Sequence, residues 1–226
     1  MVHRISILAL SLLLPALAGA EPAAPAAAVA SATGGDPTQV VGELQAALLG
    51  VMKDAKALGY DGRYQRLEPV VQQVFDLRFM AEKSVGRHWA GAGDQNQKAL
   101  VATFARFTVA NFAGRFDGWS GQSFRITGVE PSTHGTVLVR THLDAPKEEG
   151  VELNYRLRQV DGRWRIVDIY LNGTVSELAL RRSEYSALVQ REGFKALLAK
   201  LDERIADLAR PPAGTKTTGE PNGKKS

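Results

Sequence analysis

Histidines and carboxylates are the side chains through which this sequence could do acid–base or metal chemistry. His88, His134 and His142 lie beyond the first 20 residues, and none has a second histidine or a carboxylate at the spacing of a metal site. Cysteine is absent from the 226 residues, which excludes disulfides, thiolate ligands and cysteine nucleophiles. The sequence also lacks a Gly-x-Ser-x-Gly elbow, a phosphate-binding loop and a dinucleotide fingerprint. We therefore expect no catalytic residue, no metal site and no cofactor.

Asp168 is the carboxylate that most resembles a functional acid, because it lies among apolar residues in a predicted strand. One interpretation makes it the acid of a small hydrolase or isomerase, with His142 as a second candidate. The other pairs it with an arginine such as Arg156 or Arg181, since buried acids are usually paired. We favour the second interpretation.

The first 20 residues have the organisation of a secretory signal peptide. A basic pair, His3 and Arg4, precedes an apolar run over residues 5–14, and Ala18-Gly19-Ala20 offers small residues for cleavage. The alternative is an uncleaved membrane anchor, but the run is too short to span a bilayer comfortably. The sequence therefore predicts cleavage after Ala20 and export to the periplasm.

Composition predicts one ordinary globular domain. Hydrophobic residues make up 44% and charged residues 23% of the chain, and the net charge is +4. Basic residues are interleaved with acids outside the tail, so we do not expect nucleic-acid binding. Residues 21–35 are rich in Ala and Pro and predict a linker, whereas residues 210–226 predict a disordered tail. The folded domain is expected over residues 36–209, about 170 residues, which is enough for a sizeable core.

Hydrophobic periodicity predicts helices first, then strands, then helices again. Asp36, Asp76 and Asp94 are expected to cap helices, and Gly59, Gly86 and Gly193 to end them. The expected helices cover residues 37–58, 63–75, 77–85, 95–116, 176–191 and 194–208. Four expected strands lie near residues 124–126, 136–143, 151–158 and 163–171, with a hairpin turn at Asp161-Gly162. Strands in meander order between helical segments indicate an α+β domain with a four-stranded antiparallel sheet.

The last predicted strand carries large apolar groups at successive positions. Strict alternation places Trp164, Ile166 and Tyr170 on one face and Val167, Ile169 and Leu171 on the other. The second face could then meet a ligand pocket or a further layer of helices. Periodicity leaves both interpretations open.

Three segments resemble the MlaC / toluene-tolerance family of periplasmic phospholipid-binding proteins. Residues 75–107 (FDLRFMAEKSVGRHWAGAGDQNQKALVATFARF) carry Phe-Asp, Met, Gly-x-x-Trp and a Phe-rich helix. Residues 151–173 (VELNYRLRQVDGRWRIVDIYLNG) carry a Tyr-Arg strand, a Gly-x-Trp turn and a Val-x-Asp strand. Residues 176–205 (SELALRRSEYSALVQREGFKALLAKLDERI) resemble the two closing helices.

Residues 173–176 depart from the family pattern, which usually places Ser two residues after the Gly. The segment TVSELALRRSEY is closest to the hopanoid-associated HpnM branch. The resemblance therefore implies either a phospholipid or a hopanoid-type lipid as the ligand.

The resemblance implies an NTF2-like or MlaC-like fold, in which helices and a curved four-stranded sheet enclose an apolar pocket. It also implies a soluble, monomeric periplasmic carrier that is not an enzyme and moves lipid between the inner and outer membranes. The implied partners are an inner-membrane transporter of the ABC type, or of the RND type for a hopanoid branch, and an outer-membrane complex. The alternative is a periplasmic adaptor or scaffold of a lipid export complex that carries nothing.

We expect the pocket wall to include large apolar residues from the middle helices and the last two strands. Plain core packing is the alternative at each position, because apolar residues are usually core. The expected lipid-binding residues are Phe79, Met80, Trp89, Phe104, Phe107, Tyr155, Leu157, Ile166 and Tyr170.

Basic residues on the first closing helix have two interpretations. Arg181, Arg182 and Arg191 could meet lipid head groups or an acidic partner. The favoured alternative is a solvated helix face on which they pair with Glu177 and Glu184.

Overall fold

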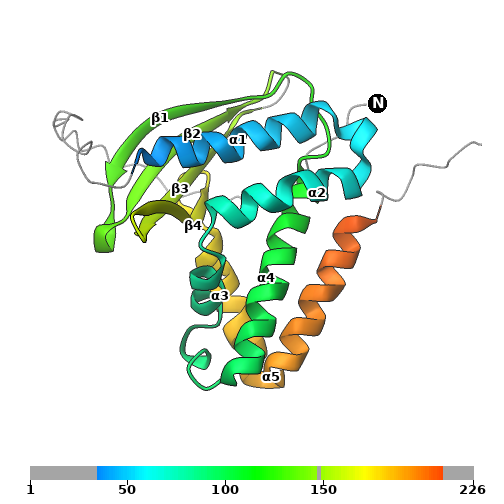
Figure 1. Ribbon diagram of the computed structural model, residues 1–226, viewed down its shortest axis with the longest axis vertical. Helices are drawn as coiled ribbons and strands as arrows, with labels where there is room; N and C mark the ends of the chain where they lie inside the picture. Colours follow the sequence, from blue (N-terminus) through cyan, green and yellow to red (C-terminus); the bar gives the residue numbers. More distant parts are fainter. Residues whose placement is uncertain (1–34, 147–148, 211–226) are drawn as a thin grey trace, which may run out of the picture.

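The computed structural model describes residues 35–146 and 149–210 (Figure 1). The predicted signal peptide over residues 1–20 lies outside this part of the chain, as do nearly all of the predicted linker and tail. Within the described ranges, no helix combines the length and hydropathy that crossing a bilayer demands. These ranges form five α-helices and a five-stranded antiparallel sheet, so the predicted α+β class is confirmed.

The first two helices are α1 (Pro37–Lys53) and α2 (Ala55–Val74), and Asp54 separates them. Asp36 caps α1 as predicted, because its side chain accepts a hydrogen bond at 2.9 Å from the amide two residues on. Gly59 has φ 60° and ψ −171°, which interrupts the helical path near the start of α2. Two helical segments therefore meet at Gly59, which confirms the prediction that a helical segment ends there.

The middle helices are α3 (Leu77–Val85) and α4 (Gly93–Arg115), joined through the short 3-10 helix η1 (Gly86–His88). Asp76 caps α3 as predicted, accepting from the amide three residues on at 3.1 Å. The prediction that Asp94 caps α4 is wrong, because the helix begins one residue earlier. The Asp94 carboxylate instead lies in the first turn, where it favours the positive end of the helix dipole.

The sheet follows the chain, with strand order β1-β2-β3-β4-β5. The hairpin between β3 and β4 turns at Asp161 and Gly162 as predicted, and both residues have positive φ, 51° and 72°. The sheet has one strand more than the four predicted. The additional strand, β5, has only two residues, which is too few to produce an alternating pattern in the sequence. A short 3-10 helix, η2 (Thr133–Gly135), joins the first two strands. The strands are β1 (Ser123–Pro131), β2 (Val137–Asp144), β3 (Val151–Val160), β4 (Arg163–Leu171) and β5 (Val175–Ser176).

Two β-bulges interrupt the regular pairing of the sheet. The register shifts between Ile126 and Gly128 in β1. It shifts again in β4, where Leu157 pairs with Ile166 and Arg156 pairs with Asp168, leaving one extra residue between them. A bulge bends its strand and increases the local twist, which accounts for the curvature of the sheet in Figure 1.

The β4 bulge decides which side chains of that strand face the helices. Because one residue is inserted, Trp164 and Ile166 share the helix-facing side with Ile169 and Leu171. Tyr170 takes the opposite side. The prediction that Trp164, Ile166 and Tyr170 share one face is therefore wrong, since strict alternation does not survive an inserted residue.

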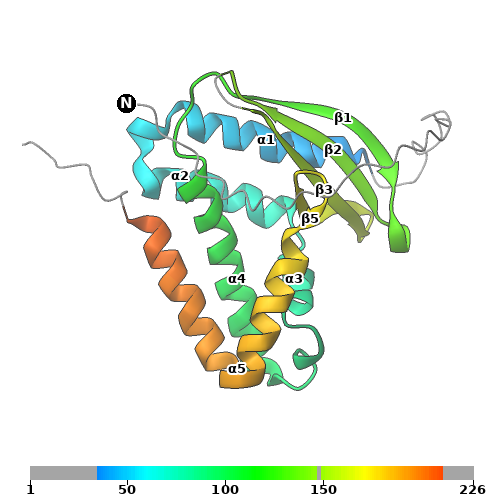
Figure 2. The ribbon, with the colours of Figure 1, turned by 180° about the vertical axis from the view of Figure 1, so that it is seen from behind.

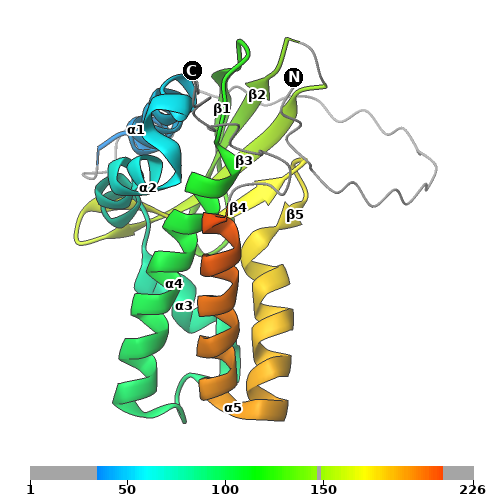
Figure 3. The ribbon, with the colours of Figure 1, turned by 90° about the vertical axis from the view of Figure 1, so that its right-hand side faces the viewer.

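The last helix, α5 (Glu177–Ala209), consists of two antiparallel halves, as predicted from Gly193. Gly193 has φ 82° and ψ 176°, and Figure 3 shows the chain reversing direction at that end of the helix. Arg204 of the second half is paired with Glu184 of the first. The two halves therefore form a helical hairpin.

The molecule has a sheet with helices on one side and a helical bundle projecting from it. Helices α1 and α2 cover one face of the sheet, and α4 runs beside both halves of α5 (Figures 1 and 2). Figure 3 shows no described helix on the opposite face of the sheet. That face carries ion pairs, Arg125 with Asp144 and Arg140 with Glu130, each at 3.0 Å.

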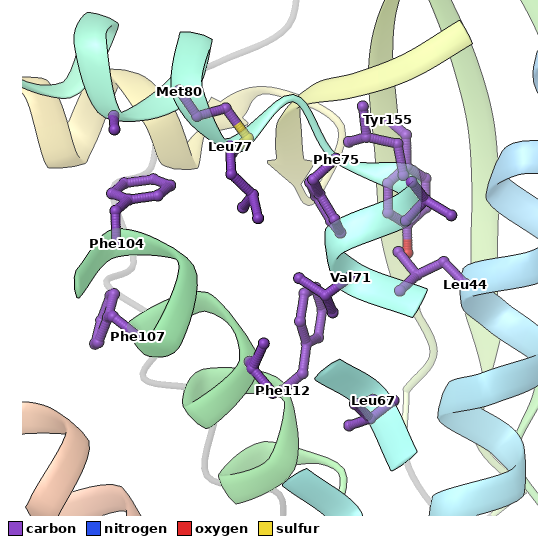
Figure 4. Packing of buried hydrophobic residues seen from close by; sticks show 14 of the residues in the cluster. Leu44, Leu67, Val71, Phe75, Leu77, Met80, Phe104, Phe107, Phe112 and Tyr155 are labelled. Atoms are coloured by element: carbon purple, nitrogen blue, oxygen red, sulfur yellow. The ribbon is translucent and has the colours of Figure 1, made fainter. Parts of the chain in front are cut away.

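The core joins the two parts. Phe75 forms an isolated parallel β-bridge with Ile166 of β4, and the Asp76 amide donates a hydrogen bond to the Ile166 carbonyl at 2.9 Å. Arg158 of β3 donates from Nε to Asp76 at 2.8 Å, which fixes α3 against the sheet. Figure 4 shows Phe112 of α4 directed toward Val71 within this cluster.

Candidate functional site

An apolar cavity of about 130 Å³ lies where the sheet meets the helices, and we call it the sheet–helix cavity. Its sheet wall comes from three strands. The alternation of β2 and β3, together with the bulge in β4, turns one set of side chains to this side. The set consists of Leu143, Val151, Leu153, Tyr155, Ile169 and Leu171.

The helical wall comes mainly from one face of α4. Thr108, Asn111 and Arg115 recur at helical spacing and line the cavity. Phe112 and Phe116 complete this face, with their ring centroids 6.0 Å apart. The remaining wall residues are Phe75, Met80, Glu177, Leu178 and Arg181.

Three polar residues on the wall are already hydrogen-bonded: Thr108, Asn111 and Arg115. Thr108 donates its hydroxyl to the Phe104 carbonyl at 2.8 Å. The Arg115 Nε donates to the Asn111 side chain at 2.9 Å. Burial raises the pKa of the Tyr155 phenol far above its usual range, so this group stays neutral. The wall therefore presents mostly carbon surface to whatever occupies the cavity.

Two of the nine residues expected to bind lipid, Met80 and Tyr155, line the sheet–helix cavity. Phe104, Phe107, Leu157 and Ile166 are buried in the surrounding core and are not part of the wall. Contact with lipid stays a prediction for Met80 and Tyr155.

The other three expected residues are aromatic and lie against arginines outside the cavity. Phe79 stacks on Arg158, with the guanidinium carbon 4.3 Å from the ring centroid. Trp89 lies against Arg78 at 5.9 Å, and Tyr170 lies against Arg156 at 5.1 Å. Their size and hydrophobicity are used in cation–π contacts rather than at the cavity wall.

Sequence reasoning missed most of the wall. Phe112 and Phe116 lie on the predicted Phe-rich helix, and their spacing from Thr108 could have grouped them. Leu153 is on the same strand face as Tyr155 and could have been found by alternation. Leu171 could not have been found by alternation, because the bulge in β4 determines which face of the sheet its side chain occupies.

Asp168 is neither a cavity acid nor an arginine partner, so the predicted arginine pairing is wrong. Its side chain is buried, with 5% exposure, and accepts three hydrogen bonds. The donors are the Ser176 hydroxyl at 2.6 Å, the Ile169 amide at 2.8 Å and the Leu178 amide at 3.0 Å. These bonds attach the start of α5 to β4.

Within the described part of the chain, the histidines do not gather with carboxylates into a cluster that could hold a metal ion. His142 Nε2 lies 3.5 Å from Asp144, at the edge of the exposed sheet face, and His134 takes a positive φ of 58° in a turn. Across residues 35–146 and 149–210, no three His, Asp or Glu side chains converge to hold a metal ion.

One comparison with known proteins identifies a family, and another identifies a similar fold. Residues 43–203 match the model of the family described as MlaC protein. No curated protein matches the sequence. The fold is similar to that of a phospholipid-binding protein from Ralstonia solanacearum, solved in complex with a phospholipid, with a TM-score of 0.68 and 21% identity over 78% of this chain and 100% of that chain. Because the family match spans well over half of the sequence, this chain belongs to the MlaC protein family.

Proposed function

We propose that this protein carries a lipid in the sheet–helix cavity. The observation that supports this proposal is a cavity with a mostly apolar wall, placed between the sheet and α4, in a chain of the MlaC family. That family is non-enzymatic and binds lipid. The similar Ralstonia solanacearum protein was solved with a phospholipid, which makes a phospholipid the first ligand to test.

The physics of transfer suits a carrier that performs no chemistry. Each buried CH₂ group contributes roughly 0.8 kcal/mol, so acyl chains do not diffuse freely through water. An apolar cavity offsets this cost. At about 130 Å³ it is smaller than the roughly 300–1,000 Å³ of typical ligand sites, so loading requires its walls to move apart.

The proposed setting is the periplasm, reached through cleavage of the predicted signal peptide. There the monomer exchanges lipid with an inner-membrane transporter of the ABC or RND type and with an outer-membrane complex. Release needs such a partner, because a ligand leaves a stable site only when another state binds it better.

The ligand is a phospholipid or a hopanoid-type lipid. The segment that resembles the HpnM branch contributes three wall residues, Glu177, Leu178 and Arg181, to the cavity. This segment is therefore well placed to select the ligand.

Mass spectrometry of an organic extract from natively purified residues 21–226 tests the proposal. Stoichiometric phospholipid or hopanoid is the expected result and also distinguishes the two ligands. An empty protein that takes up no lipid from vesicles would contradict the carrier function. It would favour the adaptor or scaffold of a lipid export complex instead.

A further inference from the structure

Arg181 is a cation set into the wall of the apolar cavity. It lies one turn into α5, and only 14% of its side chain is exposed. Its guanidinium carbon is 5.4 Å from the ring centroid of Phe104 and 5.1 Å from that of Phe107. Two aromatic faces therefore hold the charge in place, as cation–π contacts do.

The guanidinium of Arg181 has N–H donors that are not engaged in hydrogen bonds within the described part of the protein. Its nearest carboxylate is Glu177, with a nitrogen–oxygen distance of 4.0 Å, which is too long for a hydrogen bond. Among the described residues no acceptor takes a hydrogen bond from Arg181, although a guanidinium offers five donors. Two other arginines in the molecule are satisfied: Arg63 bonds to backbone carbonyls and Arg158 bonds to Asp76.

With 14% of its side chain exposed, Arg181 is partly shielded from water, and a charge-assisted hydrogen bond to an incoming acceptor would be stronger there than at the open surface. The cavity supplies the place for that acceptor, because Arg181 lines it beside apolar Leu178. The charged wall residues are Arg115, Arg181 and Glu177, so positive charge is in excess. An anion is therefore the complementary ligand group, and phosphate matches the planar fork of a guanidinium.

We propose that Arg181 binds the phosphate of a phospholipid whose acyl chains occupy the sheet–helix cavity. This inference rests on the proposed carrier function and makes the ligand an anionic amphiphile rather than an uncharged hopanoid. Glu177 competes with the phosphate for Arg181, so it weakens binding of an anion. Arg182, the next residue, packs on Gly86 of η1 instead and is not part of the cavity wall.

The test compares two lipids with identical acyl chains, phosphatidylglycerol and the uncharged diacylglycerol, offered in vesicles to delipidated protein. Lipid bound per protein is measured by mass spectrometry for the wild type, Arg181→Gln, Arg181→Lys and Arg182→Gln. The wild type is expected to prefer phosphatidylglycerol by about tenfold, the scale of a charge-assisted hydrogen bond. Arg181→Gln loses this preference, Arg181→Lys keeps part of it, and Arg182→Gln leaves it unchanged.

Glu177→Gln provides a second variant that keeps Arg181 in place. Glu177→Gln is expected to strengthen the preference for phosphatidylglycerol. The proposal can therefore be tested even if Arg181→Gln does not fold. A preference that survives in well-folded Arg181→Gln, or equal loading of both lipids by the wild type, overturns the role of Arg181 and leaves the carrier function standing. Failure of the wild type to take up either lipid overturns the carrier function itself.

Discussion

Three donors surround the Asp168 carboxylate, and each belongs to a different part of the chain. The Ile169 amide is in β4, the Ser176 hydroxyl is at the end of β5, and the Leu178 amide is in the first turn of α5. Ser176 also accepts a hydrogen bond from the Ala179 amide at 2.9 Å, so it caps the helix while bonded to Asp168. One buried carboxylate thus fixes the direction in which α5 leaves the sheet.

Replacing Asp168 with alanine is expected to destabilise the protein by about 2–4 kcal/mol, because it leaves buried donors without an acceptor. Urea denaturation followed by circular dichroism measures the change. Asp202→Ala is the control, since Asp202 forms an exposed ion pair with Arg106 and its loss is expected to cost less than about 1 kcal/mol. Equal effects of the two substitutions would contradict the role given to Asp168.

Leu178 and Leu180 give a matched pair for testing the cavity. Leu178 lines the cavity, whereas Leu180, two residues further along α5, is 54% exposed. Leu178→Trp is expected to fill part of the space and lower lipid loading severalfold, while Leu180→Trp leaves loading unchanged. Mass spectrometry of lipid extracted from each variant is the measurement. Unchanged loading in Leu178→Trp would place the lipid elsewhere.

At the scale of elements, Gly193 sets the geometry of α5. Its φ of 82° and ψ of 176° fall in a region that residues with a Cβ rarely adopt. A Cβ at this position would meet no other atom within 4 Å, so any cost of substitution comes from the backbone alone. The reversal between the two halves therefore depends on glycine.

Gly193→Ala is expected to lower the free energy of unfolding by about 1–3 kcal/mol. Gly50→Ala is the opposite control, because Gly50 lies within α1 and a Cβ there also meets nothing within 4 Å. That substitution is expected to stabilise the protein by about 0.5–1 kcal/mol. Thermal unfolding of both variants is the measurement, and a stable Gly193→Ala protein would contradict the assignment.

The elements that sequence predicts well are those whose signals are local. Capping by Asp36 and Asp76 and the break at Gly193 each depend on residues within one turn, and the structure confirms them. The bulge in β4 leaves no such local signal, because it arises from pairing with β3. That is why Tyr170 is expected in the pocket yet lies on the opposite sheet face, and why Leu171 is missed.

At the scale of the whole molecule, the cavity lies at the junction between two parts. The bonds between Asp76, Ile166 and Arg158 hold α3 to the sheet, whereas the cavity separates α4 from the same sheet. Because the cavity leaves space between α4 and the sheet, we expect the two parts to separate there when a lipid enters.

Ligand binding at this junction is expected to stabilise the whole fold. A ligand that binds only the native state adds about 2.7 kcal/mol at a concentration one hundred times its dissociation constant. Delipidated protein should therefore unfold at a lower temperature than reloaded protein, as measured by differential scanning calorimetry. Leu180→Trp should show the same lipid-induced rise in unfolding temperature, and Leu178→Trp should show a smaller one. An unfolding temperature that does not change when lipid is added would contradict binding at this site.

The reversal at Gly193 also returns the far end of α5 to the level of the cavity. Leu208 lies so close to Gly114 of α4 that a Cβ on the glycine would be 3.1 Å from the leucine side chain, and the next residue of α4, Arg115, is part of the cavity wall. A fluorescent dye attached to the single cysteine of an Arg210→Cys variant would consequently lie near the wall and could report loading in real time. By the same reasoning, an affinity tag for purification is better fused ahead of α1 than behind α5.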